Sequence, residues 1–140
     1  NGILLDTHAL YWIVTDAMPL AEDALIAITK AQDEGALFVS PITAWELSIA
    51  LQKPVHRNPP NLGDHSVRSW FREALRQTDA KIIPVRQRIC EIAADVPVVT
   101  GHRDPGDCFL LATAKLRKIP LLTEMQRFNA LLKDTLDTSA

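Results

Sequence analysis

Gly2-Ile3-Leu4-Leu5-Asp6-Thr7-His8 is an apolar run that ends in a carboxylate. Because its apolar residues do not alternate with polar ones, the run predicts a strand buried on both faces, at the centre of a parallel sheet covered by helices. Asp6 follows at the carboxyl end of this strand, where open α/β sheets bind their ligands. Asp is also a favoured N-cap for a helix that follows. This stretch alone leaves a ligand-binding role and a capping role for Asp6 equally open.

Strands and helices alternate along the rest of the chain. Further strands are predicted at 36–40, 81–85 and 120–124, and helices at 8–15, 21–33, 86–95 and after Ser40-Pro41, Ser66 and Asp104-Pro105. Pro84 cannot donate a hydrogen bond to a neighbouring strand, so the strand at 81–85 is expected at an edge of the sheet or to end there. The alternation predicts an α/β fold with a mainly parallel sheet and right-handed crossovers.

Length and composition indicate one globular domain. Of the 140 residues, 47% are hydrophobic and 23% are charged, as in ordinary globular proteins. A loop rich in proline and asparagine, 53–65, separates two halves that are each too short for a core of their own. We therefore expect residues 1–140 to form a single domain. The apolar runs are too short for a membrane span or a signal-peptide core.

The charge balance and the cysteines narrow the functional classes. Fifteen Lys and Arg against 17 Asp and Glu give a net charge of −2, which argues against binding nucleic acid by bulk electrostatics. An enzyme that acts on nucleic acid through a local site remains compatible, as does a partner that brings positive charge. Cys90 and Cys108 lie in helical patterns without ligand spacing, so we expect two buried, reduced thiols in a cytoplasmic protein and no zinc site.

Glu46 stands out among the glutamates because of its apolar neighbours. In the helix after Ser40-Pro41, the spacing of Ile42, Trp45 and Ile49 predicts an inward-facing stripe, and Glu46 falls within it. A carboxylate facing a core is costly unless a partner neutralises it. The alternative is an exposed glutamate at the edge of a narrow stripe. The two interpretations are about equally supported.

Two aspartates begin the helix after residue 104, and one glutamate ends the last predicted strand. Asp104 precedes a proline, so a capping role is favoured for it. Asp107 heads the apolar stripe that continues through 110–114, which predicts that it points inward from the first helical turn. Glu124 follows the strand at 120–124 as Asp6 follows the first strand. Asp6, Glu46, Asp107 and Glu124 can lie along one crevice at the carboxyl edge of the sheet.

Several carboxylates in one crevice repel one another and raise each other's pKa unless a hard cation joins them. Mg²⁺ or Mn²⁺ is the natural occupant, and such an ion suits attack by water on a phosphodiester. The sequence contains neither a phosphate-binding glycine loop nor a dinucleotide fingerprint, which makes chemistry on a nucleotide cofactor an unlikely class. A serine or cysteine triad has no support either, because no G-x-S-x-G elbow occurs.

Four motifs carry a resemblance to a known family. LLDTHALYW at 4–12, ITAWELSI at 42–49, HRDPGDCFLLATA at 102–114 and PLLTE at 120–124 occur in this order and at these separations. Together they resemble PIN-domain ribonucleases, specifically the VapC-type toxins of bacterial toxin–antitoxin pairs. The resemblance runs to about Phe128. It implies a PIN-like three-layer sandwich with a mainly parallel sheet of four or five strands flanked by helices.

The resemblance also implies site residues. Those that match the family's acidic metal ligands are Asp6, Glu46 and Asp107, and Asp104 matches an extra aspartate before the third acid. The family's usual fourth acid falls at Met125, and Glu124 stands one residue early, which leaves a second metal site in doubt. Candidates for contacting the substrate are Thr7, His8, Thr123 and Arg103. For the threonines, ordinary capping is an equally good explanation.

By the same resemblance, the chain is a Mg²⁺-dependent endoribonuclease, with Mn²⁺ as a possible substitute. It would form a homodimer and bind a small cognate antitoxin that presents a basic side chain to the acids. The departure at Met125 motivates an alternative, a PIN-like domain that lost catalysis and acts through a protein partner. A phospho-acceptor signalling domain ranks last, because its acid pair and its lysine after the last strand are not evident.

Overall fold

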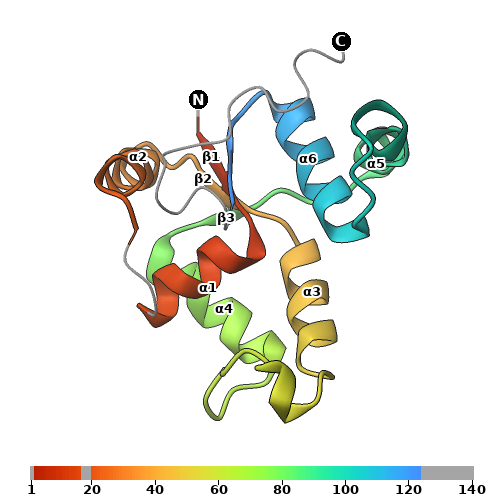
Figure 1. Ribbon diagram of the computed structural model, residues 1–140. Coiled ribbons are helices and arrows are strands. Elements are labelled where there is room, and N and C mark those ends of the chain that lie inside the picture. Colours follow the sequence, from red (N-terminus) through yellow and green to blue (C-terminus); the bar gives the residue numbers. More distant parts are fainter. Residues whose placement is uncertain (1, 17–19, 124–140) are drawn as a thin grey trace.

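A computed structural model describes residues 2–16 and 20–123 of the chain. The strands are β1 (Ile3–Leu5), β2 (Leu37–Val39), β3 (Lys81–Ile82) and β4 (Leu121–Leu122). The helices are α1 (Thr7–Thr15), α2 (Glu22–Asp33), α3 (Ile42–Ala50), α4 (Val67–Thr78), α5 (Gln87–Thr100) and α6 (Pro105–Arg117), with a short 3₁₀ turn η1 (Val55–Arg57) (Figure 1).

The strands form one parallel sheet in the order β3-β2-β1-β4. β1 lies in the interior of the sheet, and its residues are at most 3% exposed, as the opening run predicts. Ile3 and Leu5 pack into one apolar cluster with α1, α2 and α4, whereas Leu4 packs into a second cluster with α5 and α6. Figure 1 shows α2 and the α5–α6 pair on opposite sides of the sheet. The predicted three-layer α/β fold is confirmed.

Side-chain caps mark the starts of three helices, α1, α4 and α6. Asp6 Oδ1 accepts a hydrogen bond from the backbone N–H of Ala9 at 2.7 Å, and Asp104 Oδ2 accepts one from Asp107 N–H at 3.0 Å. Ser66 caps α4 in the same way through Ser69 N–H. The predicted edge position of the third strand is also correct, since β3 pairs only with β2 among the described strands. The starts of α1, α4 and α6 are therefore encoded locally by short polar side chains, whereas α2, α3 and α5 have no side-chain cap.

Three expectations were wrong. α5 does not end at Asp95: although proline is disfavoured inside a helix, α5 continues through Pro97 to Thr100, and Gly101 N–H closes the last turn on the Pro97 carbonyl at 2.9 Å. The predicted inward stripe of α3 faces outward instead, with Trp45 46% and Ile49 43% exposed, while Thr43 and Leu47 are buried. Cys90 is exposed and only Cys108 is buried.

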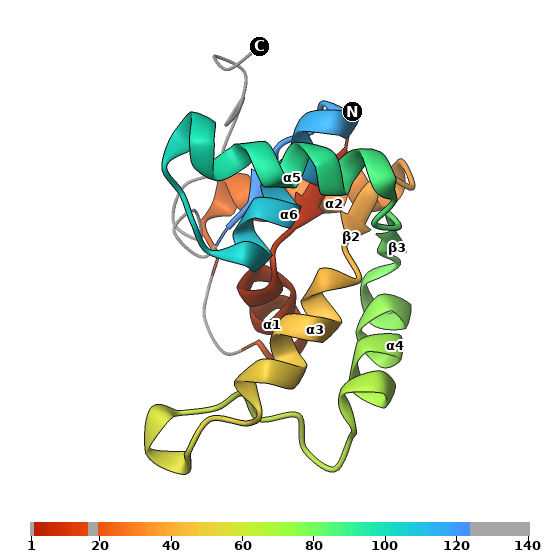
Figure 2. The same cartoon turned by 90° about the vertical axis from the view of Figure 1, so that its right-hand side faces the viewer.

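The structure also bears on the expected absence of a membrane span and on the loop at 53–65. The described part of the chain contains no helix with both the length and the apolar character that crossing a bilayer requires. Glu124 and Met125, and any closing strand after them, lie outside the described residues. The loop at 53–65 contains η1 and, in Figure 2, reaches the end of the molecule opposite α5.

Candidate functional site

A cavity of about 780 Å³ opens beside Asp6, which follows β1, and between α1, α3 and the start of α6. Its described lining consists of four acids, Asp6, Glu46, Asp104 and Asp107, together with Thr7, His8, Tyr11, Trp12, Trp45, Leu47, Ile49, Ala50, Lys53, Asn58, Pro59, Pro60, Asn61, Pro105, Gly106 and Leu110. The four acids come from three segments that are far apart in the sequence. Their convergence is a consequence of the parallel sheet, which carries the ends of its strands to one edge.

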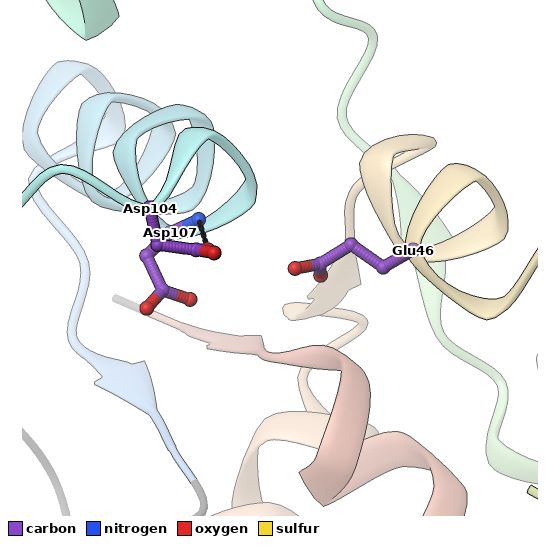
Figure 3. Close-up of side chains that lie close together, drawn as sticks. All are labelled: Glu46, Asp104 and Asp107. Atoms are coloured by element: carbon purple, nitrogen blue, oxygen red, sulfur yellow. Dashed lines mark hydrogen bonds between the residues drawn. The ribbon is translucent and has the colours of Figure 1, made fainter. Parts of the chain in front are cut away.

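Three of these carboxylates form a tight group. Oxygen atoms of Glu46, Asp104 and Asp107 all lie within 4.8 Å of one another. Figure 3 shows Glu46 reaching from α3 toward the two aspartates at the start of α6. Asp6 lines the same cavity and is 8% exposed, but it is not a member of this group. Asp104 both caps α6 and belongs to this group. The capping role that is favoured for it therefore does not exclude a role beside the metal ligands.

Polar and steric contacts hold Glu46 in place. Thr7 Oγ1 donates a hydrogen bond to Glu46 Oε1, and the Oγ1 atom of the fully buried Thr43 lies 3.2 Å from that of Thr7. On the other side, a Cβ atom at Gly106 would lie 2.1 Å from Glu46 Oε2. The carboxylate therefore occupies space that only glycine leaves open. Gly106 is not among the predicted site residues, although a glycine within a helix, where it is disfavoured, is a usable signal.

His102, which is also not among the predicted site residues, contacts Asp107. Its Nε2 lies 2.7 Å from Asp107 Oδ2. The backbone of His102 is itself fixed, because its N–H donates to Thr100 Oγ1 at 3.1 Å and its carbonyl accepts from Cys108 Sγ at 3.3 Å. The histidine thus orients one oxygen of Asp107 from outside the acidic group. Its only signal in the sequence is its position five residues before Asp107.

The site concentrates negative charge. Burial raises the pKa of Glu46 above its ordinary value, and the nearby Asp107 and Asp104 add to this, against the opposing effects of the Thr7 hydrogen bond and of His8. No lysine or arginine in the described part of the chain forms an ion pair with Glu46, Asp104 or Asp107. Two half-buried carboxylates, of Glu46 and Asp107, and the exposed carboxylate of Asp104 repel one another, and together they are a suitable set of ligands for a hard divalent cation.

The raised pKa of Glu46 predicts a pH dependence of stability in the metal-free protein. Between pH 4.5, the ordinary pKa of the carboxyl, and the higher pKa of the folded state, the folded chain binds more protons than the unfolded chain. The free energy of unfolding should therefore fall as pH rises through this window, and this component should be absent in Glu46→Gln. Urea unfolding in EDTA at several pH values measures it.

Glu91 provides a control of opposite sign for this measurement. Hydrogen bonds from Gln87 and Arg88 lower the pKa of Glu91, so its contribution to stability is present above pH 4.5 and is lost as pH falls through the folded-state pKa. Glu91→Gln should remove that favourable contribution, which is small because the pair is exposed. The prediction for Glu46 is contradicted if the wild-type protein and Glu46→Gln have the same slope of stability between pH 4.5 and neutral pH.

The residues predicted to contact a substrate fall in different places. Thr7 contacts Glu46, and the exposed His8 lines the cavity with its ring 5.8 Å from that of Trp12. Neither Thr123 nor the exposed Arg103 belongs to the described lining of the cavity. Glu124 lies outside the described residues. The structure thus brings together the predicted acids before residue 123 with Thr7 and His8, and adds Gly106 and His102.

Comparisons with known proteins agree with this fold. The model of a family described as PIN domain matches residues 3–131. A toxin–antitoxin complex from Klebsiella pneumoniae has a chain with a similar structure, at a TM-score of 0.50 and 19% identity over 86% of this chain and 83% of that chain. FitAcB from Neisseria gonorrhoeae gives a TM-score of 0.52 and 19% identity, over 85% of this chain and 84% of that chain.

A structure of FitAB bound to an IR36 DNA fragment is also similar, with a TM-score of 0.50 and 18% identity over 90% of this chain and 87% of that chain. At these identities the likeness concerns the fold. No curated protein matches the sequence.

Proposed function

We propose, from the premise that the chain belongs to the PIN domain family, that it is a metal-dependent endoribonuclease and the toxin of a type II toxin–antitoxin pair. PIN domains are generally nucleases that use a divalent metal. The observation that carries the proposal is the group of three carboxylates within 4.8 Å, in a cavity that a fourth acid also lines. The substrate is RNA, and the products are those of phosphodiester hydrolysis.

The donor set fits Mg²⁺ or Mn²⁺, which prefer carboxylate oxygens and retain water ligands. Asp6, Glu46 and Asp107 would hold the ion, with Asp104 beside Asp107. A bound ion would lower the pKa of water and neutralise charge that develops on the phosphate oxygens. Soft ligands do not compete, because Cys108 is buried and its pKa is raised by burial and by the nearby aspartates.

The chain's own side chains hold the carboxylates of the site in position. Thr7 fixes one oxygen of Glu46 by a hydrogen bond, and His102 does the same for Asp107. Both contacts prevent the carboxylates from swinging apart under their mutual repulsion when no cation is present. These arrangements supply the orientation on which hydrolysis by a positioned water depends.

We also propose which partners the chain binds and where in the cell it acts. One of the similar structures is a toxin–antitoxin complex, which supports a cognate antitoxin for this chain. Such an antitoxin would place a basic side chain beside Glu46, Asp104 and Asp107, with which no described lysine or arginine forms an ion pair. We further propose that residues 1–140 form one domain, that the protein is a homodimer, and that it acts in the cytoplasm, where thiols such as Cys90 stay reduced.

Incubation of the purified protein with total RNA tests the function. Cleavage should occur with Mg²⁺ and stop when EDTA removes the metal, and added Mn²⁺ should restore it. A single-stranded DNA of matched sequence serves as the comparison for RNA preference. Absence of cleavage with either metal would contradict the proposal. That result would favour the alternative, a domain that binds a protein partner without catalysis, for which Met125 at the usual position of the fourth acid is the motivation.

A further inference from the structure

His102 connects the end of α5 to the acids at the start of α6. Its backbone is held on both sides, because its N–H donates to Thr100 Oγ1 and its carbonyl accepts from the Cys108 thiol. Gly101 before it has a φ of +79°, a conformation that glycine adopts readily and that turns the chain out of α5. The imidazole ring lies with Nε2 2.7 Å from Asp107 Oδ2. His102 therefore sets how the Asp107 carboxylate is rotated.

The contact with His102 engages one of the two oxygens of Asp107. The other two acids of the group are held in the same way: Thr7 donates to Glu46 Oε1. Asp104 Oδ2 accepts from the backbone N–H of Asp107. In the part of the chain that the structure describes, no hydrogen bond reaches the second oxygen of any of these three acids. Each carboxylate thus uses one oxygen to hold its orientation and keeps the other for a ligand.

A carboxylate that offers a single oxygen is a monodentate ligand, and this arrangement distinguishes small from large cations. Mg²⁺ takes a near-ideal octahedron of oxygens at about 2.0–2.1 Å and usually retains several waters. Ca²⁺ takes roughly six to eight oxygens at about 2.3–2.6 Å and commonly uses both oxygens of a carboxylate. A donor held against the second oxygen opposes the bidentate arrangement, because that oxygen would have to leave its hydrogen bond to reach the ion.

Of the donors to these three acids, His102 is the one whose side chain can be removed with the least disturbance of the fold. The bond to Asp104 is a helix cap, and Thr7 is buried. The side chains of His102 and Asp107, in contrast, are 49% and 43% exposed. A substitution at His102 therefore changes the freedom of Asp107 while the helices and the core remain in place.

We propose that His102 is a positioning residue that holds Asp107 as a monodentate ligand and thereby shifts the preference of the site from Ca²⁺ toward Mg²⁺. This inference rests on the proposed metal-dependent function and names a determinant of its metal. His102 acts through Asp107 and does not itself contact the ion. The preference is a property of the protein and its ion, so it is measurable without RNA.

Displacement of Mn²⁺ from the purified protein, followed by the electron paramagnetic resonance signal of free Mn²⁺, tests the proposal. Mg²⁺ and Ca²⁺ are added separately as competitors, which gives the ratio of their affinities. His102→Ala should lower the ratio of Mg²⁺ affinity to Ca²⁺ affinity about tenfold, because both oxygens of Asp107 then become available to Ca²⁺. His102→Gln keeps an N–H donor at a reach similar to that of Nε2 and should restore the ratio of the wild type.

His65→Ala is the matched control. His65 is also exposed and also hydrogen-bonded through its ring, with Nδ1 2.8 Å from Ser69 Oγ, but it lies outside the described lining of the cavity. Its substitution should leave the ratio of affinities unchanged. Circular dichroism verifies that the variants are folded.

An unchanged ratio in His102→Ala overturns the proposal, and so does an equal loss of affinity for Mg²⁺ and Ca²⁺, which would make His102 a general support of the site and not a determinant of its metal. A lowered ratio that His102→Gln does not restore overturns it as well, because the hydrogen bond would then not be the cause. The assay measures no cleavage. Its failure is therefore distinguishable from failure of the ribonuclease proposal, which the wild type's metal-dependent cleavage decides.

Discussion

Replacing Glu46 with glutamine should lower the rate of RNA cleavage by more than the roughly 10- to 100-fold that loss of a residue supporting a metal ligand costs. The substitution keeps the size of the side chain and its hydrogen bond with Thr7, but it removes a negative charge from the group formed with Asp104 and Asp107. Affinity for Mn²⁺ should fall as well, because a neutral amide is a weaker ligand for a hard cation than a carboxylate.

The same variant should be more stable than the wild type when no metal is present. Its amide carries no charge that burial and two neighbouring aspartates disfavour, and this is the cause of the raised pKa of Glu46. Loss of activity combined with gain of stability is typical of a functional site, and not of a structural residue. Single-turnover cleavage, calorimetric titration with Mn²⁺ and thermal unfolding in EDTA measure the three quantities.

Glu22→Gln is the matched control for these measurements. It makes the same chemical change in an exposed glutamate on α2, outside the cavity, and should leave cleavage and Mn²⁺ affinity unchanged. If Glu46→Gln cleaves RNA at the wild-type rate, then the acidic group is not the catalytic site, whatever its affinity for metal. If Glu22→Gln lowers cleavage equally, the effect is one of net charge and the assignment fails.

The interior position of β1 and the start of α6 can be predicted from local sequence. The unbroken apolar run before Asp6 required a strand with both faces covered, and the structure places it inside the sheet. Asp104 before a proline required a helix start, and the structure has one there. Both signals act within a few residues, because burial of a strand and capping of a helix are properties of short segments.

The face of α3 could not be predicted in this way. Ile42, Trp45 and Ile49 lie on one side of the helix and Leu47 on another, so more than one apolar stripe can be drawn. Packing of α3 against α1, α4 and α6 buried the side that contains Leu47. Glu46 lines the cavity, but not because it belongs to an inward-facing apolar stripe, as its neighbours predicted. It is half-buried because α6 begins beside it, and a contact across about 60 residues leaves no periodicity in the sequence.

Gly106→Ala should abolish most of the activity and leave the fold intact. The added methyl group would lie 2.1 Å from Glu46 Oε2, so the carboxylate must move away from Asp104 and Asp107. The clash is with the end of a flexible side chain and not with backbone, and alanine has a better helix propensity than glycine by up to about 1 kcal/mol. Stability should therefore change little, while Mn²⁺ affinity and cleavage fall as they do in Glu46→Gln.

A double-mutant cycle shows whether the loss acts through Glu46. If it does, Gly106→Ala should have little further effect on cleavage in a Glu46→Gln background, because there is no carboxylate left to displace. Gly63→Ala should give the opposite pattern. Gly63 has a φ of +65°, and a Cβ atom added there would meet no atom within 4 Å. The substitution should therefore cost about 1 kcal/mol of stability through backbone strain and leave cleavage unchanged. Additive losses in the cycle would contradict the steric account, and would mean that residue 106 affects the site by a route other than the position of Glu46.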